Sequence, residues 1–270
     1  MTSTSTFSTT VLDVKPLPAV IGAASGAAVV VIPRAVAGSS GLSMILAVYA
    51  VIMLVGYIVA SLTVGDTVGE ICRGVLLGAT AAMNWAIASV LFPKLFGAAG
   101  VVLAIIAGVY PFLSVFPIIS RFGLYSGLLG YLNWLLPMSW PIVALGFTFF
   151  LLCALGALIG LGGATFFQIE RLVFHWQTGT LFTRGGWISN LNPIDTAFNM
   201  ATFAFVDVKY PAMAIDHESG HTLNLAAFGS LFHLVGAFDE NVITKQFAFS
   251  ERLAESHVPG TPGPALAMWL

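Results

Sequence analysis

Long apolar runs separated by short polar breaks dominate the first 163 residues of the chain. Four of these runs contain 19 to 24 residues and no charged side chain. A helix of about 20 apolar residues is long enough to cross the roughly 30 Å of hydrocarbon in a bilayer. The pattern therefore predicts four membrane-spanning helices, over residues 42–64, 74–92, 97–120 and 142–163, with residues 93–96 as the turn between the second and the third.

Two shorter apolar segments leave the total between four and six membrane helices. Residues 17–33 are rich in small residues, and we expect a short first membrane helix or a re-entrant segment there. A signal peptide is the alternative, but Arg34 stands too close to the possible cleavage site. Residues 124–136 are too short to span comfortably, and Pro137 ends them.

Beyond residue 163, apolar and charged positions are more closely mixed. Residues 166–176 are typical of a helix that lies in the membrane interface. Residues 180–189 indicate a hairpin around Gly185 and Gly186, and residues 203–208 alternate as a strand does. This β element either packs as a purely structural hairpin or offers an edge strand to which a peptide can add.

The next segment, residues 211–233, is apolar on almost every side, which predicts a buried helix beginning at Pro211. The predicted fold class is thus an α-helical polytopic membrane protein with a small C-terminal α+β part. We divide the chain into a disordered N-terminus (1–16), a transmembrane helical domain (17–163), a C-terminal region (164–257) and a loose tail (258–270).

Composition supports a multi-pass integral membrane protein, with the lipid bilayer as its surroundings. Of the 270 residues, 58% are hydrophobic and 8% are charged, against about 25% charged in soluble domains. All five histidines lie beyond residue 163, so we expect the chemistry there. The formal net charge of −2 gives no basis for nucleic-acid binding. Cys72 and Cys153 are expected to be small buried hydrophobes rather than a disulfide.

The buried helix carries the motif HExxH, formed by His217, Glu218 and His221. Two imidazoles one helical turn apart can both reach a single tetrahedral Zn²⁺. The glutamate beside the first histidine then reaches a water molecule next to the metal and can serve as its general base. A pair of core histidines that satisfy each other is the alternative. Asn224 shares the face of His217, and it either positions a substrate carbonyl or forms a packing hydrogen bond.

A catalytic zinc ion needs a third protein ligand. The longer motif HExxHxxGxxH is excluded, because Asn224 and Ala227 occupy its glycine and histidine positions. In residues 249–255, Ser250 can cap a helix that carries Glu251 and Glu255 one turn apart, one to bind the metal and one to hydrogen-bond a ligand histidine. The downstream candidates for the third ligand are His233, Asp239, Glu240, Glu251, Glu255 and His257.

The sequence HESGH followed by ERLAE resembles the HExxH…ExxAD pattern of gluzincin metallopeptidases. It is most similar to polytopic members such as the type I CAAX prenyl endopeptidases and the HtpX-like membrane proteases. The resemblance implies a zincin-like C-terminal part, in which zinc is bound by His217, His221 and Glu251, with Glu218 as base. Glu255 takes the place of the family's Asp, which hydrogen-bonds a ligand histidine, and 29 residues separate His221 from Glu251.

These observations lead to two hypotheses. The first is a membrane-integral zinc metallopeptidase that hydrolyses peptide bonds of a peptide or protein substrate at or near the membrane surface. The second is a non-enzymatic membrane scaffold or subunit with a structural or inactive metal site. A site-2-type protease ranks lower, because residues 192–195 (NPID) precede HExxH instead of following it. A transporter also ranks lower, since the apolar runs hold almost no ionisable residues.

Overall fold

A computed structural model describes residues 16–37, 42–64, 66–116, 123–191, 197–209, 214–244 and 248–255. The expectations for a disordered N-terminus and a loose tail lie outside these residues, apart from Pro16. The same holds for the NPID segment, for Pro211 and for His257.

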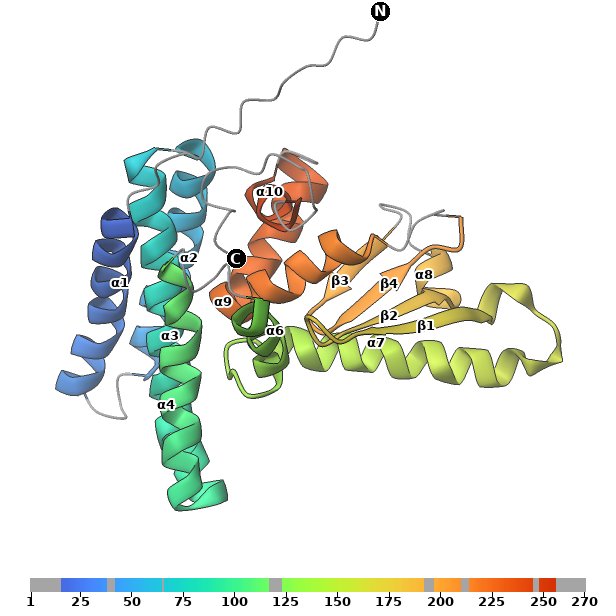
Figure 1. The fold of residues 1–270 in the computed structure, drawn as a ribbon, viewed down its shortest axis with the longest axis horizontal. Helices are drawn as coiled ribbons and strands as arrows, with labels where there is room; N and C mark the ends of the chain where they lie inside the picture. The colour runs from blue at the N-terminus through green and yellow to red at the C-terminus, as the bar shows by residue number, and fades with distance from the viewer. Residues whose placement is uncertain are drawn as a thin grey trace, which may run out of the picture.

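The N-terminal half is a helical bundle, seen at the left of Figure 1. It consists of α1 (Pro16–Ala37), α2 (Leu42–Leu62), α3 (Thr67–Phe96) and α4 (Ala98–Phe112), and it is followed by α6 (Gly123–Tyr131) and α7 (Trp140–Ile159). Among the described residues, four helices are long and apolar enough to cross a membrane, which confirms the four predicted runs. Their ranges are Ser43–Leu62, Thr67–Phe96, Ala98–Val115 and Trp140–Ile159.

The predicted second span, residues 74–92, differs from the structure at both ends, since helix α3 already begins at Thr67. Helix α3 continues through Pro93 to Phe96, and the chain turns at Gly97, whose φ of 58° favours glycine. Pro93 lies in the last turn of the helix, and its carbonyl oxygen accepts the N–H of Gly97. Helix α6 has only nine residues, so residues 124–136 form no span, whereas residues 17–33 do lie within a helix.

Helices α1 and α3 pack backbone to backbone through glycines. Gly22 and Gly26 of α1 face the backbone of α3, while Gly74 and Gly78 of α3 face that of α1. A Cβ atom at Gly74 would lie well inside van der Waals contact of the Ala19 carbonyl oxygen. Small residues permit this close approach, which is the usual means by which membrane helices associate.

Gly74→Ala is therefore expected to destabilise the protein, although alanine is intrinsically the better helix former. The added methyl group forces the two helices apart, and such overpacking costs about 1–3 kcal/mol. Thermal unfolding in detergent measures the effect, with Ala99→Leu, at an exposed position of α4, as the control that leaves the midpoint unchanged. An unchanged midpoint in Gly74→Ala would contradict this packing.

The C-terminal part contains a four-stranded sheet with the strand order β1-β2-β4-β3. Strands β1 (Ile169–His175) and β2 (Thr180–Gly185) are antiparallel, β2 and β4 (Phe203–Val206) are parallel, and β3 (Ala197–Met200) pairs antiparallel with β4. Figure 1 shows α7 lying beneath this sheet and running across the direction of α3 and α4. Strand β3 is an edge strand of the described sheet, next to the helix that carries His217 and His221.

Two predictions for the sheet region are wrong. Residues 166–176 form no interfacial helix, because residues 169–175 are rich in β-branched and aromatic side chains and pair with β2 as strand β1. The hairpin turn lies between β1 and β2 rather than at Gly185 and Gly186. These two glycines, with φ of 79° and 83°, lead instead into the short helix α8 (Trp187–Leu191). The predicted strand at 203–208 is confirmed as β4.

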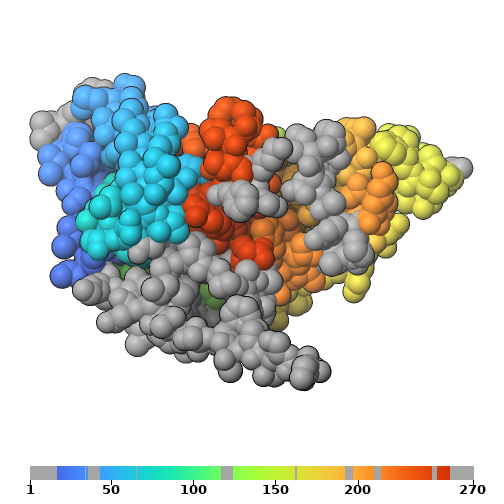
Figure 2. Space-filling view, turned by 90° about the horizontal axis from the view of Figure 1, so that it is seen from above, coloured from blue at the N-terminus to red at the C-terminus, as the bar shows by residue number. Residues whose placement is uncertain are grey.

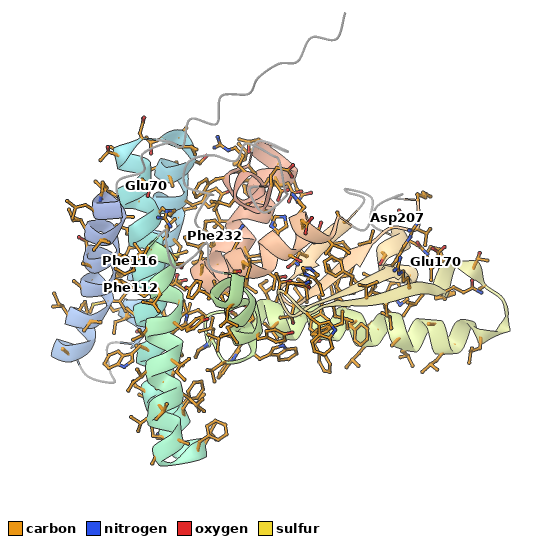
Figure 3. All side chains as sticks on the ribbon, in the orientation of Figure 1. Glu70, Phe112, Phe116, Glu170, Asp207 and Phe232 are labelled. Carbon is orange, nitrogen blue, oxygen red and sulfur yellow. The ribbon has the colours of Figure 1, made fainter. Side chains whose placement is uncertain are left out.

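The HExxH helix is α9 (Ile215–Phe238), which is broken at Gly229, where φ is 78° and ψ is 176°. A π-helical turn (Asp239–Ile243) and α10 (Phe249–Glu255) follow. One hydrophobic cluster joins Tyr57 of α2 with Phe232 of α9 and Phe249 of α10. Figure 3 shows Phe232 where the C-terminal helices meet the bundle. In Figure 2 these helices lie between the bundle and the sheet. The motif helix α9 is thus packed against α2 and α3, which are long and apolar enough to cross a membrane and are called membrane-type helices below.

Candidate metal centre

His217 and His221 stand one turn apart on the first half of α9, with their ring centroids 4.9 Å apart. Their Nε2 atoms face each other at 3.2 Å. Two imidazole nitrogens at this separation can both bind one ion at a shared position. The helical spacing predicted from HExxH is therefore present in the fold.

Glu251 reaches the same position from α10. Its Oε2 lies 3.2 Å from His217 Nε2, and its Oε1 lies 3.1 Å from His221 Nε2. One donor atom from each of the three residues lies within 4.8 Å of the other two. With metal–ligand bonds of about 2.0–2.1 Å, tetrahedral geometry places neighbouring ligand atoms about 3.3 Å apart. The donor set His217, His221 and Glu251 therefore fits a metal ion such as Zn²⁺.

Glu255 supplies an outer contact to this donor set. Its Oε2 lies 2.9 Å from Nδ1 of His217, on the side of the ring opposite to Nε2. A carboxylate in this place accepts the Nδ1 proton and fixes the tautomer in which Nε2 carries a lone pair, as is usual for metal-ligating histidines. Because α10 is helical, Glu251 and Glu255 lie on one face and contact opposite nitrogens of the same ring.

Glu218 is buried and lines a cavity of about 360 Å³ together with His217, His221 and Glu251. Its negative charge favours the charged form of both imidazoles and so contributes to the raised pKa of His217 and of His221. The edge strand β3 contributes all four of its residues to the cavity wall. The apolar part of the wall is formed by Ile188, Leu191, Ala197, Phe198, Met200 and Ala237.

The other candidates for the third ligand that the structure describes lie outside the donor set. Both carboxylate oxygens of Asp239 accept hydrogen bonds, one from Tyr57 and one from Thr244, each at 2.8 Å. Glu240 lines the cavity but does not join the three converging donors. The amide of Asn224 donates to the backbone oxygen of Ser250 at 3.4 Å, which fits the packing alternative.

His233 comes close to the motif because α9 is broken. Twelve residues of continuous helix would separate it from His221 by about 18 Å along the axis. The break at Gly229 brings the two ring centroids to 6.1 Å. His233 Nε2 lies 2.9 Å from the carbonyl oxygen of Asn199 in β3, to which it donates. The histidine therefore connects the second half of α9 to the edge strand.

Sequence reasoning missed two residues that hold the motif helix. The amide of Asn199 donates to the carbonyl oxygen of Glu218 at 2.8 Å and to the Thr222 hydroxyl at 3.1 Å. His175, predicted to be an interfacial residue, instead lies with its Nδ1 3.1 Å from the Ser219 hydroxyl. Neither belongs to a motif, and the one available signal was a polar residue inside an apolar segment.

The electrostatics of the centre follow from its crowded charges. Burial disfavours a charged imidazole at His217, but the hydrogen bond that its ring donates to Glu251 and the nearby carboxylate charges outweigh the effect of burial and raise the pKa of His217 to about 9. The charge of Glu251 also raises the pKa of His221 against the effect of burial. Burial opposes ionisation of Glu251 itself, yet the two imidazoles hold its pKa well below the usual range. Burial and the neighbouring His221 lower the pKa of His233 to about 4.

These pKa shifts predict that zinc affinity rises with pH up to about 9 and then levels off. Below that pH the metal must displace a proton from His217, and each displaced proton changes the affinity by up to about tenfold per pH unit. Competition titrations against a chromophoric chelator, corrected for protonation of the chelator, measure this slope. An affinity independent of pH between neutral pH and pH 9 would contradict the arrangement.

Comparison of the chain with protein family models, with curated proteins and with solved structures finds no match.

Proposed function

We propose that this chain is a membrane-integral, zinc-dependent metallopeptidase that hydrolyses peptide bonds at or near the membrane surface. The observation that supports it most is the convergence of three metal-binding atoms beside a buried glutamate, in a cavity bordered by an edge strand. Three protein ligands are typical of catalytic zinc sites, which keep one position open, whereas structural sites usually have four. Four helices with the length and apolar character of membrane spans support the location.

In this proposal, His217, His221 and Glu251 hold the zinc, and Glu255 keeps His217 in the tautomer that can bind it. The bound ion would polarise a substrate carbonyl and acidify a water molecule. Glu218 then removes a proton from the attacking water and passes it to the leaving amine. The motif spacing places Glu218 next to both histidines without making it a ligand, as this role requires.

The lining of the cavity supports an expectation for the substrate class. Strand β3 is an edge strand, so an extended peptide can add to it through those backbone groups of its outer edge that His233 does not occupy, while its side chains enter alternate pockets. The wall between β3 and α8 is apolar. We therefore expect the enzyme to prefer extended peptides with a bulky apolar residue next to the scissile bond.

The test is a peptide-cleavage assay with the purified protein in detergent. A library of extended peptides is analysed by mass spectrometry before metal removal, after removal with a chelator, and after zinc is restored. The proposal expects cleavage beside apolar residues that is lost on chelation and recovered with zinc. Stoichiometric zinc binding without cleavage of any peptide would instead support the non-enzymatic scaffold, in which the metal has a structural role.

A further inference from the structure

The segment that carries the third ligand is attached to the membrane-type helix α2 on both sides of Glu251. The backbone N–H of Ser250 donates to the hydroxyl oxygen of Tyr57 at 3.3 Å. The guanidinium of Arg252 donates to the carbonyl oxygen of Ser61, one turn further along α2, at 3.1 Å. The two residues that flank Glu251 in sequence are therefore both hydrogen-bonded to α2.

Tyr57 is itself tightly held. Its hydroxyl donates to Oδ2 of Asp239 at 2.8 Å, so the oxygen is oriented to accept from Ser250. Its ring packs edge-on against Phe232 and Phe249, with centroid distances of 5.2 and 5.6 Å. Tyr57 is 2% exposed. A buried phenol with these contacts has one orientation, which suits it to fix the position of a neighbouring helix end.

Helix α10 needs such a contact. It has seven residues, too few to be stable through its own backbone bonds. The first N–H groups of a helix have no partner within the helix, and the N–H of Ser250 is one of them. Glu251 must nevertheless meet two histidines of another helix at the distances that metal binding requires. Functional sites hold their side chains within about 0.5 Å of the required positions.

We infer that Tyr57 is a positioning residue of the metal centre, which caps α10 from the membrane helix α2 and so places Glu251 against His217 and His221. This role rests on the metal centre of the proposed function, but it does not depend on peptide hydrolysis. It makes α2 a structural part of the metal centre as well as a membrane-type helix.

The chain offers a matched control in Tyr49, eight residues earlier on α2 and equally buried. Its hydroxyl lies 3.1 Å from the Thr80 hydroxyl and donates to the carbonyl oxygen of Phe228 at 3.3 Å. Thr80 also donates to that carbonyl, at 2.9 Å, so the carbonyl keeps a partner in Tyr49→Phe. Each of the two Tyr→Phe changes removes one buried hydroxyl. Of these two hydroxyls, that of Tyr57 is hydrogen-bonded to α10 and that of Tyr49 is not.

The experiment is a Co²⁺ titration of the full-length protein in detergent, because cobalt reports ligand geometry through its visible spectrum. We expect Tyr57→Phe to lower cobalt affinity by about tenfold. This is the lower end of the loss in metal affinity that is typical when a residue supporting a metal ligand is changed. Its absorption bands should also shift as Glu251 loses its fixed position. Tyr49→Phe should retain the affinity and the spectrum of the wild type.

Wild-type affinity and spectrum in Tyr57→Phe, or equal losses in the two variants, would overturn the role of Tyr57. If Tyr57→Phe does not fold, Asp239→Asn and Asp239→Ala replace it, since asparagine keeps an oxygen that accepts from Tyr57 and alanine does not. Asp239→Asn should then bind cobalt like the wild type and Asp239→Ala about tenfold more weakly; equal affinities would overturn the role. A wild type that takes up no cobalt would overturn the metal centre as well.

Discussion

Replacing Glu218 by glutamine is expected to lower kcat for peptide hydrolysis by about 10²–10⁴-fold, while zinc binding remains at the wild-type level. Glutamine has the shape of glutamate but cannot take up a proton from the attacking water. Because Glu218 lies beside the donor set without belonging to it, the metal keeps all three ligands. Cleavage of the preferred library peptide and zinc content are measured on the same preparations.

Glu170→Gln is the control for this change. Glu170 lies in β1, about half exposed, and forms an ion pair with Arg184 rather than a contact in the cavity (Figure 3). It should keep the wild-type cleavage rate. A Glu218→Gln protein that still cleaves at the wild-type rate would contradict the assignment of the general base, even if zinc were present.

Removal of Glu251 is expected to have the largest effect on metal binding. Glu251→Ala leaves two histidines, which do not hold a catalytic zinc ion, so the bound zinc should be lost on purification. Glu255→Gln should cost less, about 10–100-fold in affinity, because it weakens an outer hydrogen bond and removes no ligand. The two changes are one helical turn apart, and together they distinguish the residue that binds the metal from the residue that hydrogen-bonds a ligand histidine.

Competition titrations with a zinc chelator provide both affinities. The assignment is supported if Glu255→Gln binds zinc more weakly than the wild type and Glu251→Ala binds it far more weakly still. Equal affinities of Glu251→Ala and the wild type would show that another group binds the metal, with Glu240 and His233 as the first to test, because both line the cavity.

Much of the helical architecture could be predicted from the sequence, because an uncharged run of about 20 apolar residues has few other stable conformations. The sheet was harder to predict. Residues 169–175 become a strand through pairing with residues 180–185, and their mixed pattern also suits an interfacial helix. The break of α9 at Gly229 was not predicted either, since a single glycine inside an apolar helical segment is common and the tertiary contacts decide its conformation.

The candidate metal centre, too, could be predicted from the sequence only in part. The spacing of His217 and His221 is a local property of one helix, so HExxH was sufficient to predict that they face one position. Glu251 was indicated by its resemblance to a family motif, and the fold brings it to both histidines. Tyr57 and Asn199 belong to no motif and reach the site from α2 and β3, which sequence spacing does not reveal.

The measurement that tests the central claim most directly is elemental analysis of the detergent-purified protein, with wild type, His217→Ala and Glu218→Gln prepared side by side. The arrangement predicts about one zinc ion per chain in wild type and in Glu218→Gln, and almost none in His217→Ala. A wild type that holds no zinc, even after zinc is supplied, would contradict both the metal centre and the proposed peptidase function.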